Sequence, residues 1–358
     1  MRLVCPGCNR SYPDDGPWRC SCGHALEFAR QPLPEGGPPE TLDRDDGLWA
    51  FEDFLPVERR VSLDEGWTPL IEASQWNAQF KLEYLFPTAS FKDRGATTTI
   101  SRAVGLGVDR IVEDSSGNAG LAIATYAARA GIEAEIFVPA DAKPGKLRAI
   151  EATGATLRTI EGSRQDVTDA CIETVESGSA YYASHAWDPA FFAGTMTAAM
   201  EIAAQRGWEA PDAVITPLGH GTLFLGAYRG FDALRRAGWI DSIPRLLGAQ
   251  AAGVAPIVAD LDGDPGTERN DAADGIQIEA PVRRDAILDA IEATNGDAVA
   301  VSAEATEREH VRLARAGFHV EPTCATATAA LARFRKKGVI DDGDDIVVAL
   351  TGSGLKGT

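Results

Sequence analysis

The chain has 358 residues and a mass of 38.0 kDa, which is more than one average domain requires. Its 44% hydrophobic and 24% charged residues exclude a mainly disordered protein, and no apolar run is long enough to predict a membrane span. The net charge of −19 and the pI near 4.7 argue against nucleic acid as a partner, because phosphate backbones would be repelled.

The acidic character is accompanied by a shortage of lysine. Only seven of the 34 basic residues are lysines, against 53 acidic residues. This composition resembles that of proteins from salt-loving organisms, whose carboxylates keep the surface hydrated. An acidic protein from a GC-rich mesophile is the alternative. Because the first residues lack the apolar core of a signal peptide, we expect a cytoplasmic protein with no membrane partner.

The first 30 residues contain four of the six cysteines. They are arranged as Cys5-Pro-Gly-Cys8 and Cys20-Ser-Cys22, which predicts a zinc ribbon over residues 1–30 with four thiolates closing a structural metal site. The second pair is one residue tighter than the usual spacing, and redox-active or metal-free cysteines are the alternative. Without a secretion signal, a disulfide framework is not expected.

A linker follows the cysteines, because proline and glycine fill six of the eight positions 32–39. We expect residues 31–78 to form this linker and a connecting segment that packs on the large lobe. Since the linker bounds the ribbon and a metal would hold it together, the ribbon is expected to be a separable unit.

Strands and helices alternate from residue 79 onwards. The expected strands are Phe80–Leu85, Arg110–Glu113, Glu133–Val138, Thr156–Ile160, Ala213–Thr216, Arg245–Ala249 and Ile346–Leu350. The expected helices are Phe91–Gly105, Ala119–Ala130, Lys143–Thr153, Ala190–Arg206, Thr222–Ala237 and Ala325–Lys337. This alternation predicts an α/β fold of two doubly wound lobes with parallel sheets. We expect a small lobe over residues 79–188 and a large lobe over 189–358, with an exposed loop over Asp260–Gly275.

The turn Pro87–Gly95 contains Lys92 in the first turn of an expected helix. The positive end of the helix macrodipole disfavours a cation there. An uncharged amine or a Schiff base explains this lysine better than helix stabilisation does, and a solvated lysine is the alternative.

Three further turns lead out of expected strands, where ligands of α/β proteins bind. The segment Asp114–Gly120 brings small hydroxyls and backbone amides to a helix start, which suits a carboxylate. The segment Thr216–Thr222 combines glycines with a helix start, which suits a phosphate. The segment Leu350–Lys356 offers two hydroxyls and no carboxylate. Taken singly, each could be an ordinary capped or flexible turn.

The order of the four turns resembles that of fold type II enzymes that use pyridoxal phosphate, in the tryptophan synthase beta-like superfamily. The resemblance is greatest to threonine synthase and its paralogues, and it runs from Glu65 to Lys356. It implies that Lys92 is the catalytic residue and forms the internal aldimine. The cofactor-binding residues that it implies are Lys92, Asn118, Gly219, His220, Gly221, Thr222, Thr351 and, as a weaker alternative to Thr351, Ser353. The substrate side would consist of Ser115, Ser116, Gly117 and Ala119.

The resemblance also implies the reaction. A lyase of the threonine synthase type converts O-phosphohomoserine and water into threonine and phosphate. The alternatives are another elimination or β-replacement on a small amino acid, as in serine/threonine dehydratase, diaminopropionate ammonia-lyase or cysteate synthase. A non-catalytic binding protein is the third interpretation. A homodimer is the habit of the family.

The sequence departs from the family pattern on the substrate side. Phe86 stands where an asparagine is usual, Ala89 where a glycine is usual, and Ala119 where most threonine synthases carry a hydroxyl. A phosphorylated substrate would then need other groups to balance its charge. The basic residues that the motifs bring nearest are Lys81, Arg94, Lys146 and Arg148.

Overall fold

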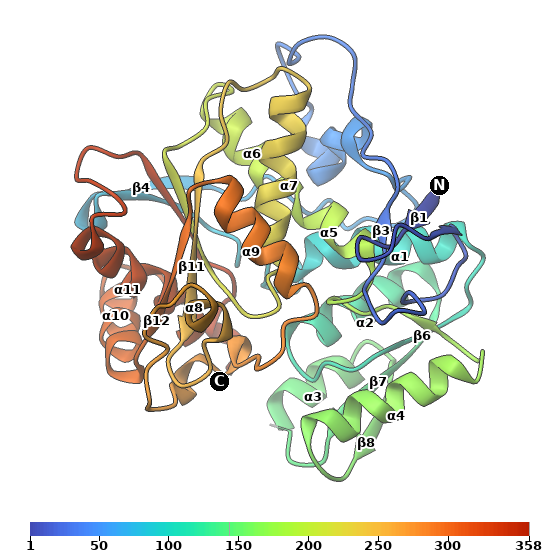
Figure 1. Cartoon of the computed structure of the whole chain (residues 1–358). Coiled ribbons are helices and arrows are strands. Elements are labelled where there is room, and N and C mark those ends of the chain that lie inside the picture. The colour runs from blue at the N-terminus through green and yellow to red at the C-terminus, as the bar shows by residue number, and fades with distance from the viewer. Residues whose placement is uncertain (143, 358) are drawn as a thin grey trace.

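Three sheets organise the chain in the computed structural model, which describes residues 1–142 and 144–357 (Figure 1). The expected α/β fold with two parallel-sheet lobes and an N-terminal ribbon is confirmed. None of the helices in this described part of the chain combines the length and the apolar character that a membrane crossing requires.

The ribbon is a small antiparallel sheet with the strand order β2-β1-β3. Its strands are β1 (Arg2–Val4), β2 (Ser11–Pro13) and β3 (Glu27–Phe28). Its core is limited to Leu3, Cys5, Cys20 and Leu26. Because so few side chains are buried, a metal or contacts with the rest of the protein must stabilise it.

The small lobe contains a four-stranded parallel sheet with the order β8-β7-β6-β9. Its strands are β6 (Arg110–Glu113), β7 (Glu133–Pro139), β8 (Thr156–Ile160) and β9 (Tyr181–Tyr182). Its helices are α1 (Lys92–Gly105), α2 (Asn118–Ala130), α3 (Pro144–Glu151) and α4 (Arg164–Glu176). The start of the helix expected at Lys143 lies outside the described residues.

The large lobe contains a six-stranded sheet with the order β12-β11-β10-β13-β5-β4, parallel except for the edge strand β4. Its strands are β4 (Leu70–Ala73), β5 (Ala78–Lys81), β10 (Ala213–Pro217), β11 (Arg245–Ala251), β12 (Asp297–Val301) and β13 (Ile346–Ala349). Its helices are α5 (Pro189–Thr195), α6 (Thr197–Gln205), α7 (Thr222–Arg236), α8 (Pro256–Asp260), α9 (Arg284–Ala293), α10 (Ala303–Arg315) and α11 (Pro322–Lys337). Short 3-10 segments are η1 (Arg44–Phe54), η2 (Ser74–Trp76), η3 (Asp271–Ile276) and η4 (Gly354–Gly357).

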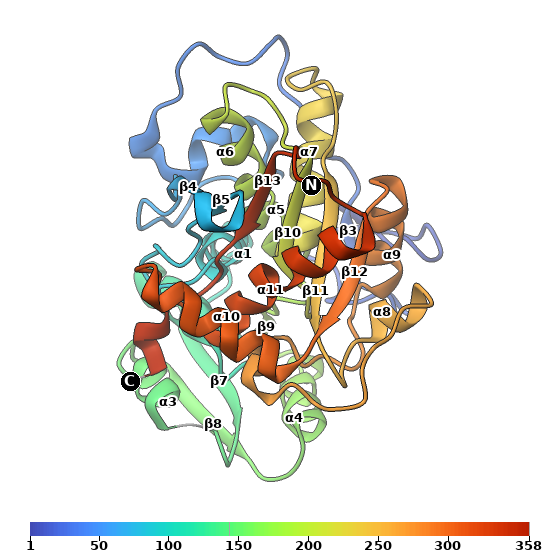
Figure 2. The ribbon, with the colours of Figure 1, turned by 90° about the vertical axis from the view of Figure 1, so that its left-hand side faces the viewer.

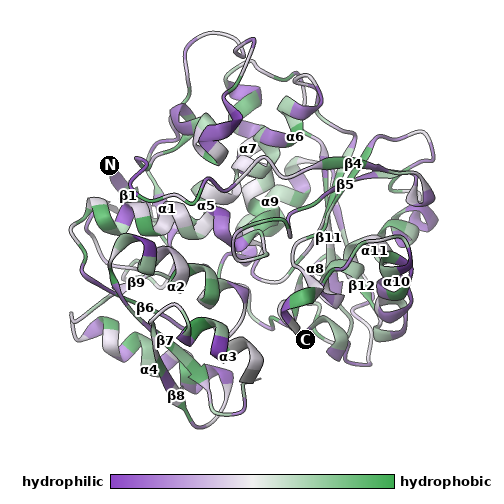
Figure 3. Cartoon of the chain, turned by 180° about the vertical axis from the view of Figure 1, so that it is seen from behind, coloured by the Kyte–Doolittle hydropathy of each residue, from purple (hydrophilic) through white to green (hydrophobic). Residues whose placement is uncertain are grey.

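Helices cover both faces of the large sheet (Figure 2). Neighbouring residues of one strand join different cores: Val214 packs with α7 and α9, whereas Ile215 packs with α11. Strand side chains alternate between faces, so a strand buried on both sides reads as an unbroken apolar run. Figure 3 shows the complementary pattern on outer helices such as α10, which bury few residues and carry many hydrophilic ones.

Two boundaries differ from the expected ones. Strand β5 pairs with β13 and therefore belongs to the large sheet, although we expected the small lobe to begin at residue 79. The expected helix Ala190–Arg206 is divided at Met196 into α5 and α6. The division into domains at residues 30, 78 and 188 otherwise stays a prediction.

The division of the helix follows from two threonines. Thr197 Oγ1 donates to the carbonyl of Gly194 at 2.6 Å, and Thr195 Oγ1, which has one proton to donate, lies 3.2 Å from the carbonyl oxygen of Phe192. Such side-chain bonds compete with the helical backbone ladder and bend it. Thr195 Oγ1 also lies 2.9 Å from the carbonyl oxygen of Thr222, so the bend supports the start of α7.

The ribbon contacts both lobes, and its expected behaviour as a separable unit stays a prediction. Arg283 is buried in an ion pair with Glu27 of β3, and it donates to the carbonyls of Leu26 at 3.1 Å and Trp187 at 2.9 Å. Arg102 of α1 donates to the carbonyl of Asp14 at 2.6 Å. The ribbon therefore supplies partners to the buried guanidinium groups of Arg283 and Arg102. The composition of the linker gave no sign of these contacts.

Candidate active site

A cavity of about 330 Å³ lies between the lobes, at the carboxyl ends of strands from both sheets. Its volume is at the lower end of the range of about 300–1,000 Å³ that small-molecule sites occupy. The structure brings together eleven of the residues expected to bind cofactor or substrate: Lys92, Ser115, Ser116, Gly117, Asn118, Ala119, Gly219, His220, Gly221, Thr222 and Thr351.

Lys92 begins α1 and reaches across to the large lobe. Its Nζ donates to Thr222 Oγ1 at 3.2 Å and lies 5.6 Å from the ring centroid of Phe191. Burial lowers the pKa of Lys92 to about 8, against a smaller opposing effect of the Glu113 carboxylate. About a tenth of the amine is therefore uncharged at pH 7, far more than for an ordinary lysine, and a nucleophilic lysine requires this uncharged form.

The Ser115–Ala119 turn opens α2, and within it the Gly117 N–H donates to Ser115 Oγ at 3.3 Å. No side chain caps this helix at Gly117, so the first N–H groups can meet an anion. The turn depends on Gly120, because a Cβ there would lie 1.8 Å from the carbonyl oxygen of Ser115. Asn118 bridges two other elements: its Nδ2 donates to Glu321 Oε2 at 2.9 Å, and its Oδ1 accepts from Lys356 Nζ at 2.7 Å.

The loop before α7 has the features of a phosphate cradle. Gly221 adopts a φ of 76°, which favours glycine, and no side chain caps the helix there. His220 lines the cavity, and its buried Nδ1 atom has no hydrogen-bond partner among the described residues. Burial lowers the pKa of His220 to about 4, so the ring is neutral. Free amides with an orphaned polar atom fit a bound phosphate group.

Thr351 and Ser353 occupy different positions. Thr351 lines the cavity, and its hydroxyl lies 3.5 Å from the thiol of Cys324. Burial raises the pKa of this thiol to about 11, so Thr351 has a neutral neighbour. Ser353 is not part of the cavity lining, and its backbone N–H donates to the carbonyl of Ala89 at 3.0 Å. Of these two residues, Thr351 is therefore the one that lines the cavity.

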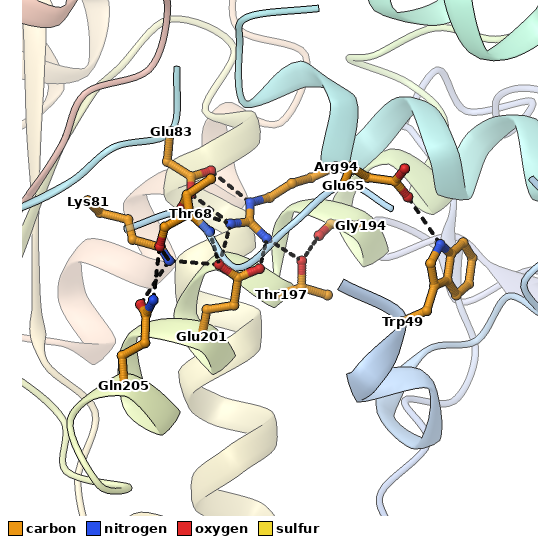
Figure 4. A network of polar contacts seen from close by, with 10 residues as sticks. All are labelled: Trp49, Glu65, Thr68, Lys81, Glu83, Arg94, Gly194, Thr197, Glu201 and Gln205. Atoms are coloured by element: carbon orange, nitrogen blue, oxygen red, sulfur yellow. Dashed lines mark hydrogen bonds and ion pairs between the residues drawn. The ribbon is translucent and has the colours of Figure 1, made fainter. Parts of the chain in front are cut away.

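Two of the basic residues expected near a substrate phosphate are used elsewhere. Lys81 and Arg94 are both buried in an ion network with Glu83 and Glu201 (Figure 4). Neither lines the cavity, so the expectation is wrong for both residues. Arg148 is exposed on α3, and the side chain of Lys146 lies outside the described residues.

The structure adds residues that the sequence analysis did not identify. Arg164 of α4 lines the cavity and forms an ion pair of 3.1 Å with Asp114. His185 also lines it, with Nδ1 2.6 Å from Glu113 Oε1. The segment 274–278 closes one side, although we expected an exposed loop up to Gly275. The only sequence signal for His185 was its place after the apolar pair at 181–182, which is too short to predict a strand.

The four ribbon cysteines converge as expected, since their Sγ atoms all lie within 4.8 Å of one another. Cys5 Sγ is 3.4 Å from Cys22 Sγ, and Cys8 Sγ is 3.5 Å from Cys20 Sγ. A tetrahedral zinc with Zn–S bonds of about 2.3 Å places sulfurs about 3.8 Å apart, so the cluster fits this ion with little movement. Four thiolates would leave no open coordination position.

Comparisons with known proteins agree with this geometry. Residues 61–352 match the family model described as "Pyridoxal-phosphate dependent enzyme". A threonine synthase of Methanocaldococcus jannaschii is 32% identical over 99% of this chain and 93% of that protein. One of Mycobacterium tuberculosis is 34% identical over 86% of this chain and 87% of that protein.

Solved structures show the same fold at lower identity. Maize serine racemase aligns with a TM-score of 0.70 at 20% identity, covering 80% of this chain and 88% of that one. The processed form of threonine deaminase isoform 2 from Solanum lycopersicum aligns with a TM-score of 0.68 at 21% identity, covering 92% and 88%. The two lobes therefore have the fold type II arrangement.

Proposed function

This chain belongs to the family of pyridoxal-phosphate-dependent enzymes, and on that premise we propose that it converts O-phosphohomoserine and water into threonine and phosphate. The observation that carries the proposal is Lys92, an amine of lowered pKa facing an uncapped helix start across one cavity. The two relatives named above are threonine synthases, and they align with this chain along 93% and 87% of their length, which supports the same reaction class.

Each end of the cavity has a role in this proposal. Lys92 would hold the cofactor, and the amides of Gly219–Thr222 would bind its phosphate. Asn118 and Thr351 would orient the ring, and the amides of the Ser115–Ala119 turn would bind the substrate carboxylate. When bound, pyridoxal phosphate supplies an electron sink for charge that develops at the α carbon.

Proton handling falls to the chain's own groups. The uncharged Lys92 amine can take the proton from the α carbon and return it, since its pKa is close to the operating pH. Thr351 brings a neutral hydroxyl and no carboxylate to the cofactor contact. A ring nitrogen without a carboxylate partner favours elimination and replacement at the side chain over transamination.

The distribution of charge favours a second candidate function. Among the described residues that line the cavity, Arg164 is the only cation besides Lys92, and it is paired with Asp114. A substrate phosphate dianion would have little other charge to balance it. An α,β-elimination or β-replacement on an unphosphorylated amino acid such as serine, threonine or diaminopropionate therefore remains the alternative. A non-catalytic binding protein would not need an amine of lowered pKa at Lys92, which argues against that interpretation.

A product assay tests the proposal. Purified, cofactor-loaded protein is incubated separately with O-phosphohomoserine, threonine, serine and diaminopropionate. Threonine and phosphate formed in equal amounts from O-phosphohomoserine is the expected result. Formation of ammonia and an oxo acid from an unphosphorylated substrate, with no threonine from O-phosphohomoserine, would establish the alternative.

We further propose that Cys5, Cys8, Cys20 and Cys22 hold one structural zinc ion, for which their convergence is the support. A homodimer, a cytoplasmic location and a salt-adapted source are expectations from the family habit and the composition. Sedimentation of the purified protein tests the homodimer, and metal analysis tests the zinc assignment.

A further inference from the structure

We infer that His185 and Glu113 form a proton-sharing pair that donates a proton through His185 Nε2 to the leaving group of the substrate. This inference rests on the proposed function, because it assigns a role in a lyase reaction. It names a second proton-handling group in the cavity besides Lys92. His185 would be the catalytic residue, and Glu113 would position it and supply the shared proton.

The fold brings the two residues together at one sheet edge. Glu113 is the last residue of β6, and His185 comes three residues after β9. These strands pair in parallel, with Val112 opposite Tyr182, so their carboxyl ends lie at the same edge. That edge faces the cavity, in keeping with the rule that ligands of open α/β sheets bind there.

The contact between them is short and protected from water. His185 Nδ1 lies 2.6 Å from Glu113 Oε1, and the glutamate side chain is fully buried while the histidine is 10% exposed. Among the residues that the structure describes, His185 Nε2 has no hydrogen-bond partner, and the ring lines the cavity. One ring nitrogen is therefore fixed, and the other is left for a ligand.

The electrostatics decide which way the pair works. Burial raises the pKa of Glu113 well above its usual range, with a further contribution from the Asp114 carboxylate. Burial lowers the pKa of His185 well below its usual range, and Lys92, His220 and Arg164 act in the same direction. The carboxyl is then protonated and the imidazole is neutral, so the pair holds two protons and no net charge. One proton lies between Oε1 and Nδ1, and the other is therefore on Nε2, which is a donor.

The position of the ring relates it to Lys92. The ring centroids of His185 and Phe191 are 6.0 Å apart, and Lys92 Nζ lies 5.6 Å from the centroid of Phe191. The centroid of the His220 ring, in the loop before α7, lies 5.4 Å from the centroid of the His185 ring. The imidazole and the amine thus approach one cavity from different elements, which suits separate proton transfers to different substrate atoms.

The chemical step needs this donor. When the carbon–oxygen bond to the leaving group breaks, its electron pair goes to the oxygen. A phosphate ester dianion would leave as a trivalent anion, and an alcohol as hydroxide, unless the oxygen gains a proton. Nε2 gives its proton to that oxygen, the shared proton settles on Nδ1, and Glu113 becomes a carboxylate. The water molecule consumed in the reaction returns a proton to the pair.

Leaving-group dependence tests the inference. His185→Asn should lower kcat about 100-fold for O-phosphohomoserine or serine, the usual contribution of a general acid. It should change kcat for β-chloroalanine less than about threefold, because chloride leaves without a proton. Glu113→Gln, which keeps the shape and cannot give up a proton, should show the same split. His319→Asn, at an exposed histidine outside this cavity, is the matched control and should change neither rate. An equal fall for all substrates would mean a structural role and would overturn the inference.

A spectroscopic measurement separates this inference from the proposed function. In protein labelled with ¹⁵N in its histidine rings, the signal missing from His185→Asn identifies His185. We expect Nε2 to carry a hydrogen throughout pH 6–8. A deprotonated Nε2 at pH 7 would refute the donor assignment. Because this measurement uses no substrate, it keeps its meaning if O-phosphohomoserine is not turned over, and serine then replaces it in the kinetic comparison.

Discussion

Two lysines in the interior of this protein have opposite chemical roles because of their partners. Lys81 Nζ donates to three oxygens, those of Thr68 at 2.6 Å, Glu201 at 2.7 Å and Gln205 at 2.9 Å. All of its protons are used, so it is a structural cation. Burial lowers the pKa of both amines, but Lys92 has a single hydroxyl partner, so its amine is available for chemistry.

The titration of Lys92 predicts how the apoprotein takes up its cofactor. Only the uncharged amine attacks an aldehyde. Since the pKa of Lys92 is lowered to about 8, the rate of attachment should rise about tenfold per pH unit below pH 8 and level off above it. Stopped-flow absorbance of the bound cofactor measures this rate. Lys92→Ala should show no attachment, and a rise continuing to pH 10 would contradict the lowered pKa.

The ion network makes a prediction about stability. Glu201 accepts from both Lys81 and Arg94, and all three side chains are buried (Figure 4). Glu201→Gln would leave an excess positive charge in the interior and should lower the free energy of unfolding by about 3–5 kcal/mol.

Urea denaturation measures that loss. Glu209→Gln, at an exposed residue of the same lobe, is the matched control and should change stability by less than about 0.5 kcal/mol. Equal stability of the two variants would mean that the network contributes nothing net.

Among the helices, α7 can bind an anion at its start because no side chain caps its first turn. Gly221 starts it in a left-handed conformation, and Thr195 from the bend between α5 and α6 supports the carbonyl of Thr222. The dipole and free amides then point at the cavity.

A pair of glycines at the two ends of α7 allows a controlled test of this start. Gly221→Asp adds negative charge where the cofactor phosphate should bind, and its affinity should fall about 100-fold. Gly238→Asp imposes the same kind of backbone cost, since the φ values are 76° and 72°, and its side chain would point into open space at the far end. A Cβ at Gly221 would in addition come within 2.7 Å of Ile287 Cδ1, so Gly221→Ala serves as the control for this contact. Fluorescence titration with pyridoxal phosphate compares them. Similar affinities would place the phosphate elsewhere.

The ribbon makes a further prediction. Arg283 is buried, and Glu27 of β3 provides its carboxylate, so removing that carboxylate leaves a charge unpaired. Glu27→Gln should lower the free energy of unfolding by about 3 kcal/mol or more. Thermal denaturation compares it with Glu35→Gln in the exposed linker. If the two variants melt together, the ribbon is independent of the lobes after all.

At the scale of the whole molecule, the excess of carboxylates predicts salt dependence. The excess carboxylates behind the net charge of −19 repel one another, and salt screens this repulsion beyond about 10 Å at 0.1 M and about 3 Å at 1 M. The melting temperature should therefore rise by several degrees between 0.1 M and 1 M KCl. Differential scanning calorimetry measures it, and a melting temperature that falls over this interval would contradict the salt-adapted interpretation.

Features that depend on neighbours in the chain could be predicted from the sequence. Lys92, the Ser115–Ala119 turn and the Gly219–Thr222 loop each lie within one strand-to-helix turn, so local geometry and glycine placement identify them. The cysteine pairs are equally local. The alternation of strands and helices implied parallel sheets, since each crossover must return the chain to the same edge.

Which distant side chains share an environment could not be predicted, because it depends on how the strands and helices pack. Lys81 and Arg94 flank the lysine motif in sequence, yet they point into the ion network and away from the cavity. His185 and Glu113 meet through the pairing of two strands 70 residues apart in register, and the ribbon meets Arg283 across most of the chain. Strand order and side-chain facing set these contacts, and neither is encoded in any single segment.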